Sequence, residues 1–130
     1  MICVRTKLRQ SKISGIGLFA DQQILKGTVV WRFEPSLDIL LSKEEVTKLS
    51  EPAQKQFYNY AFLDKTYKKY LLCGDDGRFF NHSEYPNCDD SLQDKTIALK
   101  DIDKGEELTV NYRTFYDDFE AHAEFQSFIS

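Results

Sequence analysis

The chain has 130 residues, a length that suits one domain and excludes two full ones, because domains usually span about 100–150 residues. Hydrophobic residues make up 42% of the sequence and aromatic residues 14%, enough apolar surface for a core, which excludes a wholly disordered chain. The net charge is −4, with +5 on residues 1–33 and −9 on residues 34–130. This balance disfavours direct binding to nucleic acid and favours a basic partner.

The sequence has no strong signal for membrane insertion or secretion and no strong cysteine motif. No apolar run approaches the roughly 18–20 residues of a membrane span, and the opening MICVRTKLRQ lacks the apolar stretch of a signal peptide. We therefore expect an intracellular protein, cytoplasmic or nuclear, without a membrane partner. Its three cysteines, Cys3, Cys73 and Cys88, are an odd number without CxxC spacing, which argues against disulfides and a four-ligand zinc site. No metal is expected.

In chain order, the β-branched and aromatic run at 28–33 predicts a strand. Ser42 and Glu45 form the pattern of a capping box for a helix at about 43–49. A second helix follows, with Pro52 in its first turn and a buried face that contains Phe57, Tyr60 and Ala61. Residues 68–73 predict a short strand and 74–77 a turn.

The C-terminal half is less regular in its pattern. Residues 78–91, RFFNHSEYPNCDDS, are too rich in Asn, Ser, Pro and Asp to predict regular structure. Segments 96–100 and 107–112 predict two short strands, paired through a turn that contains Asp103 and Gly105. The tail, 116–130, has the spacing of a helix with an acidic outer face.

Gly15-x-Gly17-x-x-Ala20 formally matches a dinucleotide-binding fingerprint. The preceding KLRQSKIS is polar, and ten residues between Gly17 and the strand at 28–33 leave no room for a crossover helix. A doubly wound nucleotide-binding fold is therefore disfavoured. A tight turn remains, in which two glycines let the backbone approach a ligand closely.

Two further segments carry polar groups with an ordinary structural explanation. Asn81 and His82 follow the apolar pair Phe79-Phe80, where they could simply hold the edge of the core. Glu106 to Tyr112 could be just an edge strand. Taken separately, neither segment indicates a function.

Their order, however, resembles the SET-domain family of protein lysine methyltransferases. The resemblance rests on SGIGLFA near the start, RFFNHSEYPN in the middle and ALKDIDKGEELTVNY toward the end, and it spans about residues 5–115 of a single domain, 1–130. It implies a mainly β fold with short helices (α+β), built of several small sheets and a C-terminal pseudoknot. That fold would place Asn81-His82-Ser83 beside the strand that ends in Tyr112.

The resemblance also implies the site. It assigns the binding of S-adenosyl-L-methionine to Gly15, Ile16, Gly17, Leu18, Asn81 and His82, with Tyr112 as the catalytic tyrosine. The aromatic tail residues, of which Phe115 is counted among the cofactor-binding residues, are the candidates to cover the adenine: Phe115, Tyr116, Phe119 and Phe125. A free lysine has a pKa of about 10.4, so an apolar channel must favour its neutral amine by desolvation. The channel candidates are Tyr58, Tyr60, Phe80 and Val110. We expect Tyr112 to orient the reacting groups and not to act as a base.

The chain departs from the family pattern in ways that bear on its partners. Glu84 stands where many members have a zinc-binding cysteine, and no cysteine follows Cys88, so we expect no zinc-binding post-SET segment. We expect a lysine-containing basic protein or peptide as substrate, and a monomer or homodimer. The alternative is a noncatalytic SET-like module that binds cofactor or a basic peptide.

Overall fold

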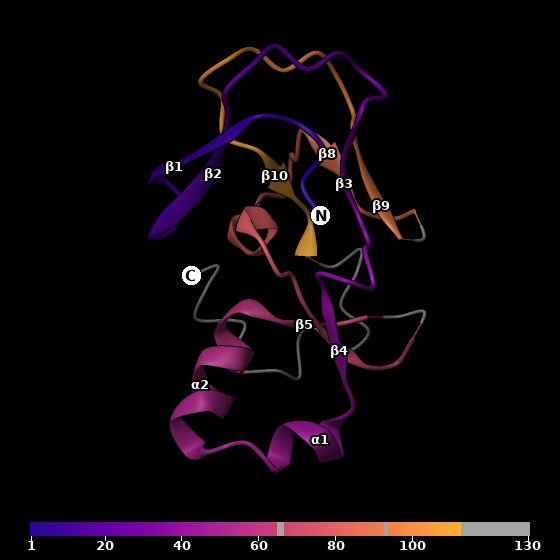
Figure 1. Cartoon of the computed structure of the whole chain (residues 1–130). Coiled ribbons are helices and arrows are strands. Elements are labelled where there is room, and N and C mark those ends of the chain that lie inside the picture. The colour runs from indigo at the N-terminus through magenta and orange to yellow at the C-terminus, as the bar shows by residue number, and fades with distance from the viewer. Residues whose placement is uncertain (65–66, 93, 113–130) are drawn as a thin grey trace.

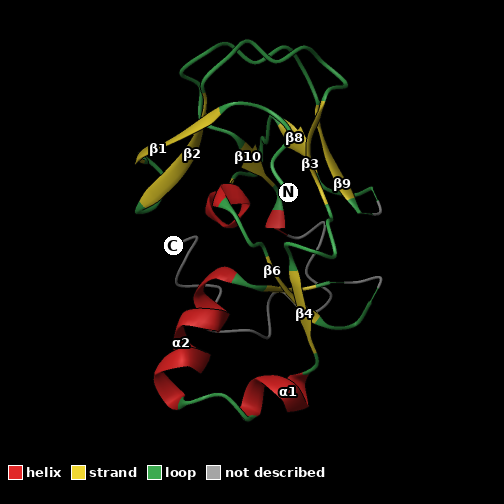
Figure 2. Cartoon of the chain, viewed as in Figure 1, coloured by secondary structure: helices red, strands yellow, loops and turns green. Residues whose placement is uncertain are grey.

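The computed structural model describes residues 1–64, 67–92 and 94–112. It consists mostly of short strands in several small sheets, with a few short helices (Figures 1 and 2), which confirms the predicted fold class. The predicted tail, 116–130, and Phe115 lie outside the described residues. In chain order the elements are β1 Thr6–Gln10, β2 Ile16–Ala20, β3 Val29–Arg32, β4 Ile39–Leu41, α1 Lys43–Thr47, α2 Glu51–Tyr60, β5 Phe62–Leu63, β6 Tyr70–Leu72, the 3₁₀ helix η1 Asp76–Phe79, β7 Asn81–His82, β8 Cys88–Asp89, β9 Lys95–Ala98 and β10 Thr109–Val110.

The strands fall into two groups (Figure 1). The upper group holds the antiparallel hairpin β1–β2, the sheet β3-β9-β8 and the parallel pair β10–β7. The lower group is the sheet β4-β6-β5, beside which α1 and α2 lie. Side chains of both groups, among them Leu18, Val30, Val46 and Tyr70, are buried together in one apolar core.

Both predicted helices are present. The Ser42 hydroxyl accepts from the Glu45 amide at 3.1 Å and the Glu45 carboxylate accepts from the Ser42 amide at 2.9 Å, so the capping box is confirmed. Helix α2 has Pro52 in its first turn and buries Phe57. The prediction that Tyr60 is buried on the same face is wrong, because its side chain is 37% exposed and borders a cavity.

The predicted strands at 28–33 and 68–73 are confirmed as β3 and β6, but the predicted pairing of the two last strands is wrong. β9 lies between β3 and β8, whereas β10 pairs in parallel with β7. The segment between them turns at Gly105 as predicted, yet its residues pair with the N-terminal part of the chain, at Ile24–Ile102 and Phe19–Glu107. These contacts carry β10 away from β9. The parallel pairing of β10 with β7 places β7 beside the strand that leads to Tyr112, as the resemblance implied.

The prediction of an irregular segment at 78–91 is only partly correct. It contains the end of η1, which Asp75 caps by accepting from the Gly77 amide at 3.0 Å, and the strands β7 and β8. Hairpin β1–β2 has no counterpart in the sequence-based prediction, because the side chains of β1 are mostly exposed and polar and lack an apolar alternation.

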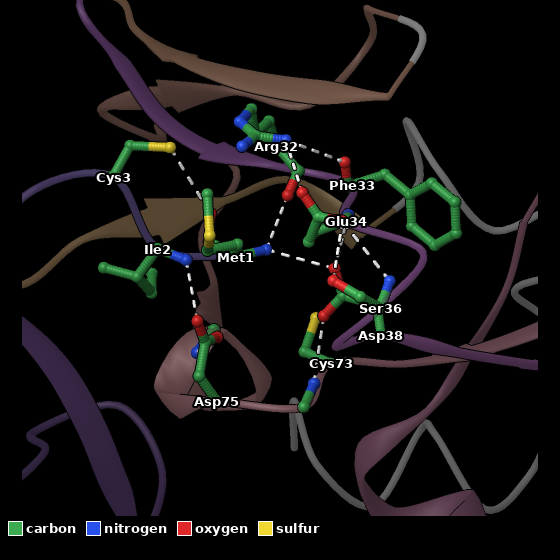
Figure 3. A network of polar contacts seen from close by, with 12 residues as sticks. Met1, Ile2, Cys3, Arg32, Phe33, Glu34, Ser36, Asp38, Cys73 and Asp75 are labelled. Atoms are coloured by element: carbon green, nitrogen blue, oxygen red, sulfur yellow. Dashed lines mark hydrogen bonds and ion pairs between the residues drawn. The ribbon is translucent and has the colours of Figure 1, made fainter.

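A buried carboxylate ties the start of the chain to the lower group of strands (Figure 3). Asp38 accepts from the Glu34 amide at 2.8 Å, the Gly74 amide at 3.0 Å and the amino group of Met1 at 3.1 Å. A side chain at Gly74 would collide with the Leu37 carbonyl, so this close approach requires glycine. No helix among the described residues is long and apolar enough to cross a membrane.

Candidate functional site

A hollow of about 300 Å³ opens between the turn before β2 and the strand β7. Gly15, with φ +46°, and the exposed side chain of Ile16 form one wall. The full lining is Ser14, Gly15, Ile16, Tyr60, Arg78, Phe79, Phe80, Asn81 and Tyr112. A cavity of this size and mixed lining suits a small organic ligand.

Glu107 holds the two walls of this hollow together. Its carboxylate accepts from Asn81 Nδ2 at 2.8 Å and from Ser11 Oγ at 2.8 and 2.9 Å. The Asn81 amide also donates to the Ser14 carbonyl at 3.1 Å, so that strand β7 is fastened directly to the turn. A Cβ at Gly17 would collide with the Glu107 carboxylate, which explains why glycine is required there. Gly17 thus makes room for this network and does not line the hollow.

Tyr112 closes the inner end of the hollow and is only 9% exposed. Its hydroxyl donates to the Phe80 carbonyl at 2.6 Å, and its amide donates to His82 Nδ1 at 3.1 Å. Burial, with a smaller contribution from the nearby Glu107 carboxylate, raises the pKa of Tyr112 well above its ordinary value. The phenol therefore stays protonated near neutral pH and can orient groups by hydrogen bonds, but it is a poor base.

Asn87 fixes the strand that carries Tyr112. Its Oδ1 accepts from the Thr109 amide at 2.9 Å, its Nδ2 donates to the Glu107 carbonyl at 2.8 Å, and its own amide donates to Thr109 Oγ1 at 3.2 Å. Asn87 and Thr109 are both buried, so the bonds between them are strong and costly to lose. One asparagine therefore sets the position of β10 and of the residues on either side.

A second, narrower cavity of about 50 Å³ adjoins the first. The two share Tyr60, Arg78, Phe80 and Tyr112 as lining residues. The remainder of its lining is Trp31, Asn59, Phe62, Cys73, Gly77, Asp90, Thr96 and Val110. We call this cavity the aromatic passage; it has polar groups in its wall, and Tyr112 borders both it and the larger hollow.

Arg78 and Trp31 bring nitrogen donors to the lining of this passage. The guanidinium of Arg78 donates to the Cys73 carbonyl at 2.9 Å and lies 5.9 Å from the centre of the Tyr60 ring. The buried indole N–H of Trp31 has no hydrogen-bond acceptor within residues 1–64, 67–92 and 94–112.

The structure brings most of the predicted site residues together. Gly15, Ile16, Asn81 and Tyr112 line the hollow, and Tyr60, Phe80, Val110 and Tyr112 line the passage. Leu18 is fully buried, and its carbonyl accepts from the Leu108 amide at 2.8 Å, so it stabilises the backbone next to the site and does not line it. Tyr58 is not brought to the passage; its ring packs edge-on against Tyr70, with 5.3 Å between ring centres.

Several residues of the site were missed by sequence reasoning, namely Trp31, Phe62, Asn87, Asp90, Thr96 and Glu107. Asn87 belongs to a quoted motif, which could have marked it. Nothing in the sequence separates Glu107 from Glu106, whose exposed side chain accepts from the Asp103 amide at 3.2 Å. Within the described part of the chain, no three His, Cys, Asp or Glu side chains are grouped to hold a metal ion.

Comparison with known proteins identifies the family to which the chain is similar. Residues 15–113 match the SET domain. The chain is 29% identical over 118 residues to human histone-lysine N-methyltransferase 2D, covering 85% of this chain and 2% of that protein. It is 32% identical over 116 residues to the H3 lysine-36 specific histone-lysine N-methyltransferase of Mycosarcoma maydis, covering 79% of this chain and 11% of that protein. The chain therefore spans only a small part of the curated relatives it matches.

Solved structures agree on the fold. Polycomb Repressive Complex 2 of Chaetomium thermophilum, in an autoinhibited conformation bound to S-adenosylmethionine, matches with a TM-score of 0.65 and 23% identity, covering 89% of this chain and 16% of that one. A candidate histone methyltransferase of Plasmodium falciparum matches with a TM-score of 0.57 and 20% identity, covering 85% and 95% of the two chains. The match over residues 15–113 shows that the chain belongs to the SET-domain family.

Proposed function

We propose that this domain transfers a methyl group from S-adenosylmethionine to the ε-amine of a protein lysine. The observation that carries the proposal is the meeting of two cavities at Tyr112: a hollow large enough for a nucleoside-sized ligand and a narrow aromatic passage that suits an alkyl amine. The relatives' names support the reaction, since they are histone-lysine N-methyltransferases.

The hollow fits S-adenosylmethionine by its size and by its open glycine turn. A Cβ at Gly15 would meet nothing within 4 Å, so the backbone of this turn has free space beside it. We assign the binding of the cofactor to Gly15, Ile16, Asn81 and Tyr112, with Gly17, Leu18 and His82 holding these residues in place. When bound, S-adenosylmethionine supplies the methyl group: the amine lone pair forms the N–C bond while the C–S bond breaks and its electron pair stays on sulfur.

The passage would prepare the lysine for this reaction. Tyr60, Phe80 and Val110 offer an apolar and aromatic lining that favours a neutral amine over an ammonium ion by desolvation. Tyr112 donates its hydroxyl proton to the Phe80 carbonyl, so toward the reacting methyl and amine its oxygen would act as an acceptor. Alignment of the two reactants in this way accounts for much of the acceleration that an enzyme can supply.

We further propose a basic, lysine-containing protein as substrate and an intracellular site of action. The charge of −9 on residues 34–130 favours the encounter with a basic segment. The relatives' names point to histones, which are rich in lysine.

The test is transfer of labelled methyl from S-adenosylmethionine to core histones and to lysine peptide arrays. Tyr112→Phe removes one hydroxyl from the site, and Tyr85→Phe, at a side chain that is 91% exposed, removes one at the surface. We expect Tyr112→Phe to lose at least about 10²-fold in rate, and Tyr85→Phe to match the wild type. Undiminished transfer by Tyr112→Phe would refute the assigned role. Cofactor binding without transfer to any lysine would indicate a noncatalytic binding module.

A further inference from the structure

The wall of the aromatic passage contains a carboxyl group that the proposed reaction has not used. Asp90 follows β8 and lines the passage together with Tyr60, Phe80 and Tyr112. Its Oδ1 accepts from Thr96 Oγ1 at 2.5 Å, a short bond that fixes the direction of the carboxyl. Thr96 is itself only 2% exposed.

Asp90 also borders a smaller hollow of about 30 Å³ on the other side. That hollow shares Trp31 and Phe62 with the passage. Its further lining is Phe33, Asp64, Tyr67, Leu71, Leu92, Asp94 and Lys95. Asp90 thus stands between the passage that ends at Tyr112 and a second opening with two more aspartates.

The surroundings of Asp90 favour its protonated form over the carboxylate. Burial, with further contributions from the Asp64 and Asp89 carboxylates and against the Thr96 hydrogen bond, raises the pKa of Asp90 to about 7. No ion pair joins it to a residue in the described ranges. The titratable and charged groups that face it from its own segment and from the neighbouring elements are Asp89, Tyr60, Asp64, Cys73, Arg78, Tyr112, Tyr67, Asp94 and Lys95.

A carboxylate without a cationic partner in an aromatic cavity is unfavourable until a cation enters. A lysine side chain brings such a cation, since its amine is charged at neutral pH. An ammonium that entered this small cavity, of about 50 Å³, would lose water and gain the carboxylate in exchange.

We propose that Asp90 binds the ε-ammonium of the substrate lysine inside the passage and accepts its proton before methyl transfer. This inference rests on the proposed function. In the step, one N–H bond breaks, its electron pair stays on nitrogen, and an O–H bond forms on the carboxylate. An ammonium and a carboxylate become a neutral amine and a carboxylic acid, and the freed lone pair is the one that attacks the methyl group.

The test compares Asp90→Asn with Asp94→Asn, which makes the same charge change in the outer hollow only. The readout is kcat/KM for a lysine peptide between pH 6 and pH 10, with circular dichroism and cofactor affinity as checks on folding. The wild type should rise with pH through the range near 7 and then level off. Asp90→Asn should lose about 10²-fold near neutral pH and regain rate as the pH approaches the lysine pKa of about 10.4. Asp94→Asn should follow the wild-type profile.

Two further measurements separate proton transfer from a structural effect. Asp90→Glu keeps a carboxylate, so it should keep the rise near neutral pH. A peptide that carries thialysine, whose amine is more acidic than that of lysine, should partly rescue Asp90→Asn. An unchanged profile in Asp90→Asn, with active wild-type enzyme, would overturn this inference and leave the proposed function intact. A wild-type domain that methylates no lysine would overturn both.

Discussion

The substitution Glu107→Ala tests whether one carboxylate holds the walls of the hollow together. It removes the acceptor of two donors, Asn81 Nδ2 and Ser11 Oγ. Hydrogen bonds to a charged group contribute about 1.5–3 kcal/mol each. Ser11 is half-buried and can regain water, and Asn81 keeps its bond to the Ser14 carbonyl, so we expect a total loss of about 2–3 kcal/mol.

For a chain of this length such a loss lowers Tm by roughly 10 °C. The turn that carries Gly15 would also be released from β7, so we expect affinity for S-adenosylmethionine to fall about tenfold, which corresponds to roughly 1.4 kcal/mol. Thermal unfolding followed by circular dichroism and calorimetric titration measure the two effects. Glu106→Ala makes the same charge change at the preceding residue, whose side chain is exposed, and should alter neither Tm nor cofactor affinity. An unchanged Tm and affinity in Glu107→Ala would refute the reasoning.

Three further predictions follow from the packing. Gly17→Ala should cost about 2 kcal/mol in the wild type but much less in a Glu107→Ala background, because the colliding carboxylate is gone; additive costs in a double-mutant cycle of denaturant unfolding would contradict this. A thiol reagent at pH 8 should modify the exposed Cys3 rapidly and reach Cys73 and Cys88 only after unfolding, since burial raises the pKa of both buried thiols, that of Cys88 to about 12; three fast-reacting thiols would be the opposite result. Asp38→Asn should destabilise the fold by about 3 kcal/mol in urea unfolding, because Asp38 accepts three hydrogen bonds. The control is Asp101→Asn, since the Asp101 carboxylate accepts from the Lys26 amide on an exposed surface. Equal stability of the two variants would exclude a special role for Asp38.

Local interactions are the part of the fold that the sequence could predict. The capping box of α1 joins Ser42 and Glu45, three residues apart, so both partners are visible in one short segment. The partner of β10 is a different matter, because Thr109 pairs with Asn81 and no local feature of either segment prefers the other. The chain between β9 and β10 also looks like a hairpin turn, and only its pairing with Ile24 and Phe19 shows why it is not one.

The residues of the candidate site likewise fall into those that a local motif marks and those that only the folded structure reveals. Motifs marked Asn81 and Tyr112, but the importance of Glu107 and Asp90 depends on which atoms meet across the fold. The pair Tyr58 and Tyr60 could have been corrected from helix geometry alone. Residues two apart on an α-helix point in nearly opposite directions, so both rings could not line one passage. Tyr60 borders the passage and Tyr58 packs on Tyr70.

The bridge between β2 and the segment before β10 has a consequence for how the protein is made. Backbone hydrogen bonds of 2.8 and 2.9 Å join Leu18 and Ala20 to Leu108 and Glu106, so the strand that follows the glycine turn is held by the segment that leads to Tyr112. Contacts between distant segments form slowly and only once both segments exist. During synthesis the N-terminal turn therefore cannot hold a ligand until the chain has been extended as far as Tyr112. Binding of S-adenosylmethionine would then report completion of the whole fold and stabilise it by mass action.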